Sequence, residues 1–371
     1  MVSSLPRPSF IERSPTTIEA EQIALWEAIA DKTLYPGQPE RLLINLLTYR
    51  EALVRIGIQY AAEQNLVNYA VGVNLDQLGA LLDVVRLPAS KARCTMQFVR
   101  AIALPTSLLI PAGTRVAVPG DAGIIFATIE NATIPANQNG VSVIAEATES
   151  GIAGNGFATG QINELLDAFS GVSMTASNTS TSADGADIES DDRFRDRIKL
   201  APNKFSVAGS VGAYRYHTLT ADQTINDAAI VSPFPTRVEV YPLTSGIPSA
   251  GILAKVTAAL SNEKVRPLTD EVAVLPPTQL SYSINASVVA LASADTATLS
   301  SQLQTAAATF ASDRRSGLGR DVVRSQLIAA LSLPGVYSVT LASPASDLIA
   351  QPSQWANCTA ISVSITGTNG G

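Results

Sequence analysis

The segment from Glu40 to Tyr69 constrains the fold of this chain more than any other stretch. Its large apolar residues recur at spacings of four and three, which is the pattern of a helix with a heptad repeat. They are Leu42, Leu46, Tyr49, Leu53, Ile56, Tyr60 and Val67. A helix of about 30 residues is roughly 45 Å long, because each residue adds about 1.5 Å. The segment therefore predicts one long helix.

A second apolar set lies on a neighbouring face of the same predicted helix. Its members are Leu43, Leu47, Val54, Ile58 and Ala61. A helix that is apolar on two faces needs more than one neighbour. Two interpretations stay open at this point: both faces pack on other helices of this chain, or one face joins a bundle with other chains. We favour the second, and we assign the protein interface to Leu42, Leu46, Tyr49, Leu53, Ile56 and Tyr60.

Shorter elements are predicted on both sides of this segment. Residues 1–15 contain three prolines and little periodicity, which is typical of an extended arm. Residues 17–31 have apolar positions that suit a helix, and the Tyr-Pro-Gly turn at 35–37 ends it. Asn74 with Gln77 three positions later forms a capping-box pattern, which predicts the start of another helix.

The pattern changes after Lys91 to short β-like runs separated by Gly, Pro and Asn. Runs of this kind predict an antiparallel sandwich or barrel. They are Thr95–Val99, Thr114–Val118, Ile124–Ile129 and Val141–Ala147. The stretch Asn178–Gly185 is rich in Ser, Thr and Asp, which is typical of a linker leaving the domain.

Strands and helices alternate in the remaining part of the chain. The expected strands are 229–241, 271–275, 280–291 and 335–341, and the expected helices are 250–265, 296–312 and 321–331. This order predicts a ferredoxin-like α+β domain with an inserted helix. One more strand is expected at 360–365, followed by a flexible end.

The predicted fold class is therefore α+β multidomain, with four parts. They are an N-terminal helical region (1–90), a middle antiparallel β domain (91–184), a C-terminal ferredoxin-like α+β oligomerisation domain (185–345), and a C-terminal tail with room for one edge strand (346–371).

The composition of the chain narrows its function. Charged residues make up only 15% of the sequence, against roughly 25% in an average soluble domain. A weakly charged surface is easier to dehydrate against a partner, which favours a part of an assembly. The formal charge of −7 argues against nucleic acid as a partner.

The sequence has no long apolar run and begins without the apolar stretch of a signal peptide, so neither membrane insertion nor secretion by that route is expected.

Reactive side chains are scarce. The single histidine, His217, leaves no histidine-rich metal site. Cys94 and Cys358 are far apart and form no CxxC pair, which favours a reducing compartment. The glycine-rich run Gly151–Gly156 lacks the residue order of a phosphate-binding loop. We therefore expect no catalytic residues, no cofactor and no metal, and a protein that is not an enzyme.

An acidic cluster precedes three arginines. Its members are Asp184, Asp187, Glu189, Asp191 and Asp192. Several carboxylates together could form a Ca²⁺ loop, but the residue order of an EF-hand is absent. Acids also suit a helix N-terminus, where they can pair with the arginines at 193, 195 and 197. We favour this capping and ion-pair interpretation, with Ser190, Asp191 and Asp192 at the helix N-terminus and the charged helical segment given as 187–200.

Six stretches of the sequence carry a family resemblance. They are LGALLDVVRLPAS at Leu78–Ser90, IPAGTRV at Ile110–Val116, FATIE at Phe126–Glu130, AEATESGIAGN at Ala145–Asn155, GADIESDDRFRDRI at Gly185–Ile198, and GLGRDVVRSQLIAALSLPGVYSVTLASP at Gly317–Pro344. In order and spacing they resemble the baseplate J-like proteins of contractile phage tails and related injection machines. One departure is Asp184-Gly185, where the family commonly has Gly-Gly.

The resemblance implies a structural component of the baseplate wedge. In this family the N-terminal helices of two copies typically join another wedge protein in a bundle, and the C-terminal domains pair into a ring around the central hub. The implied partners are a second copy and neighbouring wedges, other wedge proteins including a lysozyme-like one, and the hub or spike. The implied location is the tail baseplate of the virion, assembled in the host cytoplasm.

The resemblance also implies that the ring rearranges when the tail sheath contracts. Two alternatives from other functional classes stay open at this point. One is a carbohydrate-binding or carbohydrate-degrading tail accessory protein, for which the β-rich middle domain is the motive. The other is a soluble enzyme with an acidic active site.

Overall fold

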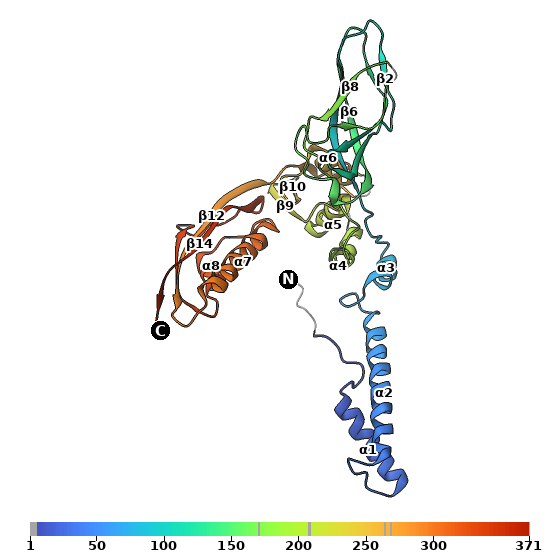
Figure 1. Ribbon diagram of the computed structural model, residues 1–371, viewed down its shortest axis with the longest axis vertical. Coiled ribbons are helices and arrows are strands. Elements are labelled where there is room, and N and C mark those ends of the chain that lie inside the picture. The colour runs from blue at the N-terminus through green and yellow to red at the C-terminus, as the bar shows by residue number, and fades with distance from the viewer. Residues whose placement is uncertain (1–5, 170, 207–208, 263–264, 268, 371) are drawn as a thin grey trace. The chain divides into compact units, whose positions relative to one another are not determined.

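Figure 1 shows the computed structural model of the chain, which describes residues 6–169, 171–206, 209–262, 265–267 and 269–370. The chain divides into two units. The N-terminal unit holds the residues up to Arg86 together with Ser190–Lys199, and the second unit holds Leu87–Glu189 together with the residues from Leu200 onward. The chain therefore leaves the N-terminal unit and later returns to it.

Helices make up most of the described N-terminal unit. They are α1 (Pro15–Ala30), α2 (Pro39–Glu63), α3 (Gly72–Ala80) and α4 (Asp191–Leu200). A proline occupies the first position of both α1 and α2, where its missing N–H leaves no helical hydrogen bond unmade. Asp31 ends α1 in the left-handed conformation, with φ of 49°. In Figure 1, α1 and α2 lie side by side.

Two helix limits differ from the sequence prediction. The long helix is confirmed, but it ends at Glu63, so Val67 lies beyond it. The predicted capping box is wrong, because α3 begins at Gly72 and Asn74 lies inside the helix. The cap comes instead from a residue far away in the sequence: the Asp191 carboxylate accepts the N–H of Gly72 at 2.9 Å.

The expected antiparallel β domain is confirmed in the second unit. Its main sheet has the strand order β7-β3-β4-β6-β1-β8, and β2 pairs with β5. The strands are β1 (Lys91–Arg100), β2 (Leu108–Ile110), β3 (Arg115–Val118), β4 (Asp121–Thr128), β5 (Ala132–Ile134), β6 (Gly140–Ser150), β7 (Glu164–Leu165) and β8 (Met174–Asn178), with a short 3₁₀ helix at Ile152–Gly154. Every second residue of β1 from Ala92 to Phe98 is buried, as the period of two requires for a strand with one core face.

The stretch that was predicted as a linker is instead an ordered part of this domain. The Asn178 side chain is fully buried and accepts the N–H of Ile162 at 2.9 Å. Ala183 and Arg93 exchange two backbone hydrogen bonds of 2.7 and 3.0 Å. The linker interpretation is wrong here, because these backbone groups pair with the domain rather than with water.

The rest of the second unit confirms the α+β class, but with a different sheet arrangement. Two separate sheets, β11-β10-β9 and β13-β12-β14, replace the single ferredoxin-like sheet that the sequence predicted. The reason lies in β12, which has β13 on one edge and β14 on the other. With both edges occupied, β12 cannot extend the sheet of β9 to β11.

Two helices pack against the first of these sheets. Its elements are α5 (Val211–Ala221), β9 (Asp227–Phe234), β10 (Arg237–Leu243), α6 (Ala250–Leu260) and β11 (Glu271–Val274), preceded by a 3₁₀ helix at Ala201–Phe205. The predicted strand 229–241 is a hairpin, because the chain turns at Thr236, which has φ of 72°. The helix predicted over 250–265 ends at Leu260, and its residues 263–264 lie outside the described residues.

The second sheet is covered by two further helices. Its elements are β12 (Thr278–Leu291), α7 (Thr296–Arg315), α8 (Arg324–Leu331), β13 (Val336–Ser343) and β14 (Gln354–Asn369). β14 runs parallel to β12 well beyond the predicted strand 360–365, so the expected flexible end is strand as far as Asn369. Gly371 of that end and residues 1–5 of the predicted arm lie outside the described residues.

Candidate protein-protein interface

The contact between α1 and α2 is largely polar. Arg41 on α2 pairs with Glu19 on α1 at 2.8 Å, and Thr48 on α2 donates to Gln22 on α1 at 2.9 Å. The apolar side chains buried on the two helices are Ile18, Ile44 and Ala52. Because ion pairs and few apolar side chains fill this contact, most large apolar residues of α2 lie outside it.

The first predicted set forms an exposed face on α2. Leu42 is 74% exposed, and Leu53, the least exposed member, is still 46% exposed. The remaining members lie between these values: Leu46, Tyr49, Ile56 and Tyr60. The structure thus brings all six predicted interface residues onto one face of one helix and leaves that face open.

The second apolar set of α2 is also exposed, and part of it lines a groove with α1. The groove has a volume of ≈ 600 Å³. Its apolar lining consists of Leu25, Trp26, Ile29, Ile44, Leu47 and Val54. The sequence analysis assigned no interface role to Leu25, Trp26 and Ile29 of α1. Their spacing of one and three residues places them on one face of the predicted helix, and this could have indicated such a role.

These two exposed surfaces are unusual for an isolated soluble chain. Leaving apolar surface in water costs about 25 cal/mol per Å², and monomeric proteins rarely expose large continuous patches of it. Packing of both faces on this chain's own helices, one of the two interpretations left open, does not occur among the described residues of the N-terminal unit. The arrangement is suited to binding helices of other chains.

The segment before α1 is fixed to the end of α2 by a buried acid. Arg7 donates two hydrogen bonds, of 2.7 and 2.8 Å, to Glu63, whose side chain is only 4% exposed. Gln59 donates to the same carboxylate at 2.8 Å and accepts the N–H of Phe10 at 2.8 Å. The pKa of Glu63 is lowered to about 2, mainly because the Arg7 guanidinium donates hydrogen bonds to its carboxylate. Part of the predicted arm is therefore held in place by a charged clamp.

This clamp should open in acid. A carboxyl group whose pKa is lowered by folding stabilises the fold above its ordinary pKa, and this stabilisation is lost as the pH falls through the folded value. For Glu63 this window runs from 4.5 down to about 2. Hydrogen exchange of the Phe10 N–H, which bonds to Gln59, reports the opening.

The same amide tests the clamp at neutral pH. Glu63→Gln should make the Phe10 N–H exchange faster at pH 7, because the charge that holds Arg7 is gone. Glu40→Gln, which changes an exposed carboxylate on the same helix, should leave it unchanged. Unaltered Phe10 protection in the Glu63 variant would contradict the clamp.

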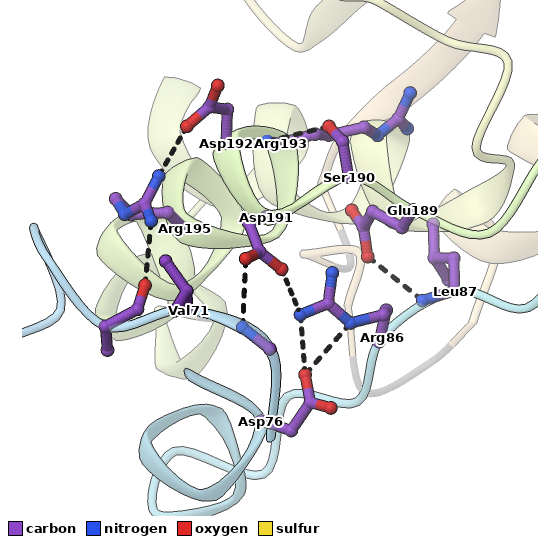
Figure 2. Close-up of polar contacts among 12 residues, drawn as sticks. Val71, Asp76, Arg86, Leu87, Glu189, Ser190, Asp191, Asp192, Arg193 and Arg195 are labelled. Atoms are coloured by element: carbon purple, nitrogen blue, oxygen red, sulfur yellow. Dashed lines mark hydrogen bonds and ion pairs between the residues drawn. The ribbon is translucent and has the colours of Figure 1, made fainter. Parts of the chain in front are cut away.

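A second charged cluster ties α4 to the segment around α3, as Figure 2 shows. Arg86 pairs with Asp76 and with Asp191, each at 2.7 Å. The guanidinium of Arg86 lies 4.7 Å from the ring centre of Phe194 on α4. The hydrogen bond from Gly72, followed by the Arg86 ion pair, lowers the pKa of Asp191. The cluster therefore joins two segments that are more than a hundred residues apart.

The acidic cluster is used for hydrogen bonds and ion pairs, in line with the interpretation that we favoured. Arg195 pairs with Asp192 three residues earlier at 2.5 Å, and it also donates to the backbone oxygens of Val67 and Ala70 at 2.8 Å. α4 begins at Asp191 rather than at Asp187, whose carboxylate accepts the N–H of Ile152 at 3.2 Å. Local sequence patterns do not reveal these distant partners.

The remaining chemically reactive groups are dispersed. His217 is half-buried beside Tyr216, and burial lowers its pKa. Burial raises the pKa of the Cys94 thiol to about 12. Among the residues that the structure describes, no group of three or more His, Cys, Asp or Glu side chains is placed to hold a metal ion. No helix in that part of the chain is both long and apolar enough to cross a membrane.

Four protein-family models match successive parts of the chain. They are the Baseplate J-like N-terminal domain at residues 39–92, the Baseplate J-like protein barrel domain at 95–185, the Baseplate J-like central domain at 206–276, and the Baseplate J-like protein C-terminal domain at 282–364. Together these matches cover most of the chain. The α+β domain expected over 185–345 overlaps the last two.

Two comparisons with individual proteins gave matches. Baseplate protein J of Escherichia phage P2 is 36% identical over 184 residues, which span 48% of this chain and 60% of the P2 protein. A chain in the cryo-EM structure of the anti-feeding prophage baseplate is 12% identical, with a TM-score of 0.45 over 91% of this chain and 89% of that chain.

Proposed function

Because this chain belongs to the baseplate J-like protein family, we propose that it is a structural component of the baseplate of a contractile phage tail or a related injection machine. The exposed apolar face of α2 is the observation that supports this function most directly. An exposed apolar face of this kind contributes favourable free energy only when another protein covers it and removes it from water.

The proposed place of the chain is the baseplate wedge. Its N-terminal helices would join those of another wedge protein, and of a second copy, in a bundle. The other proposed neighbours are a lysozyme-like wedge protein and the central hub or spike. The proposed location is the virion tail baseplate, after assembly in the host cytoplasm. No nucleic acid and no membrane takes part in this proposal.

The sheet β13-β12-β14 supports the second part of the proposal, in which C-terminal domains pair into a ring. Its two outer strands, β13 and β14, contain no charged residue. Edge strands of monomeric proteins are commonly protected by charges. Uncharged edges are therefore suited to contacts with neighbouring copies, and such contacts could rearrange when the sheath contracts.

Loss of the gene tests the proposed function. Particles made without this chain should lack complete baseplates in electron micrographs, and the full-length chain supplied in trans should restore them. A carbohydrate-binding accessory protein would give a different result, with complete tails that fail only at attachment to cells. Complete baseplates in the absence of the chain would contradict a structural role.

A further inference from the structure

The second unit contains two domains that each have a hydrophobic core of their own. We call the part from α5 to β11 the central domain and the part from β12 to β14 the C-terminal domain. The core of the central domain includes Val240 and Val256, whereas the core of the C-terminal domain includes Val288 and Leu303. The two clusters share no residue. The connection between the domains and the contacts across it therefore decide how one is held against the other.

The connection between these domains is short and stiff. The N–H of Leu275 bonds to the backbone oxygen of Val240 at 2.9 Å, which fixes it to the central domain. The N–H of Thr278 bonds to the backbone oxygen of Ser353 at 3.0 Å, which fixes it to the C-terminal domain. Only the two prolines at 276–277 lie between these anchored residues. A proline ring locks φ but leaves ψ to rotate, so the linker is suited to a turn about a few bonds.

Two hydrogen bonds with charged side chains cross from one domain to the other. The Asp227 carboxylate at the start of β9 accepts the N–H of Leu318 at 2.8 Å. The Arg315 guanidinium at the end of α7 donates to the backbone oxygen of Ser245 at 2.6 Å. A cavity of ≈ 440 Å³ adjoins the second bond, with Arg315 and Ser245 in its lining. The two domains are therefore not close-packed at this point.

Both charged groups keep a partner inside their own domain when these bonds open. Asp227 also pairs with Arg215 on α5 at 2.6 Å and accepts the N–H of Ala228 at 2.8 Å. The Arg315 guanidinium lies 5.4 Å from the ring centre of Trp355 on β14. Opening therefore leaves no unpaired buried charge, which is the main penalty when one partner of a buried ion pair is lost. The two bonds can break without destabilising either domain.

We propose that Asp227 and Arg315 form a reversible latch, which holds the C-terminal domain in one orientation and, when it opens, lets this domain turn about the prolines at 276–277. The proposal rests on the proposed function for its purpose: it names the contact through which each copy changes shape when a ring of C-terminal domains rearranges. The latch itself is a property of the single chain and can be tested there.

Hydrogen exchange in the purified full-length chain tests whether the two bonds open together. Arg315→Met removes one of them and leaves the bond from Leu318 to Asp227 in place. The Leu318 N–H should nevertheless exchange about 10-fold faster, because losing a charge-assisted bond raises the opening equilibrium by about that factor. The Ser316 N–H, which bonds back to Ser312 of α7, should keep its rate.

The matched control is Arg237→Met. Arg237 pairs with Glu239 and Glu271 inside the central domain, so its loss should leave the exchange of the Leu318 N–H unchanged. An unchanged Leu318 rate in the Arg315 variant would overturn the latch, because the two bonds would then open independently. Equal acceleration at Ser316 would overturn it as well, since the end of α7 would then be fraying by itself.

A distance measurement between spin labels tests the turn. The labels are attached at Ala258→Cys on α6 and Ala308→Cys on α7, which are exposed positions of the two domains. Cys358→Ser removes the half-buried native thiol, and the buried Cys94 stays unlabelled. With the latch intact, electron paramagnetic resonance should give one narrow distribution of distances between the labels.

Removing both latch side chains should add a second distance. The variant is Asp227→Ala with Arg315→Met, and amide protection in β10 and β12 should stay unchanged, which shows that both domains remain folded. The same single distribution in this variant would show that the domains do not turn, and the proposal would be wrong. Both measurements use the isolated chain, so such a failure leaves the baseplate role standing, whereas the loss of the gene tests that role without the latch.

Discussion

Replacing Leu46 and Leu53 together with glutamate should prevent the chain from joining the proposed wedge partners while its domains stay folded. The two residues are 57% and 46% exposed, so the free energy of unfolding should change by only about 0.5 kcal/mol or less for each. In a bundle both would be buried, and each leucine then contributes about 1.5 to 3 kcal/mol. The double variant should therefore bind its partner more than about 100-fold more weakly.

Co-purification with the partner wedge protein, together with particle yield in electron micrographs, measures this effect. Leu109→Glu is a matched control, since Leu109 is 53% exposed but lies on β2 of the β domain. The control should assemble, and its melting temperature should match that of the double variant. Normal particles from the double variant would show that the exposed face of α2 is not the interface.

The apolar face of α2 could be predicted from the sequence because helical periodicity is a local property. The spacing from Leu42 to Tyr60 places the six residues on one face whatever the rest of the chain does. The openness of that face could not be predicted, since it depends on how α1 packs. Thr48 and Gln22, 26 residues apart, form one of the polar contacts that hold α1 against α2 away from Leu42, Leu46 and Leu53.

Two of the errors of prediction concern contacts between distant residues. Asn74 and Gln77 have the spacing of a capping box, yet the helix is capped by Asp191, which accepts the N–H of Gly72 from 119 residues away. The strand order followed the ferredoxin-like pattern, but β12 pairs with β14, a strand whose sequence had indicated only a short tail element. Local patterns predicted the elements and their class, whereas strand partners and caps depend on the whole fold.

Phe194→Ala should unfold the contact between α4 and the rest of the N-terminal unit. The Phe194 side chain is fully buried, and its ring lies so close to Gly79 that a Cβ there would be 2.5 Å from Cζ. Arg86 covers the ring with its guanidinium. Removing a phenylalanine from such a site typically costs about 3 to 5 kcal/mol, because the lost contacts leave a cavity.

The effect should be confined to one unit, which hydrogen exchange can resolve. The N–H of Val84, which bonds to Gly79, should lose protection, while β1 and β6 should keep theirs because the β domain has its own core. Phe205→Ala is the matched control, since Phe205 is 69% exposed and its loss leaves no cavity. If the Val84 N–H stays protected while only the amides of α4 exchange faster, the ion pairs of Arg86 are sufficient to keep α3 folded without the aromatic ring. Equal loss in β1 would mean that the two units unfold as one.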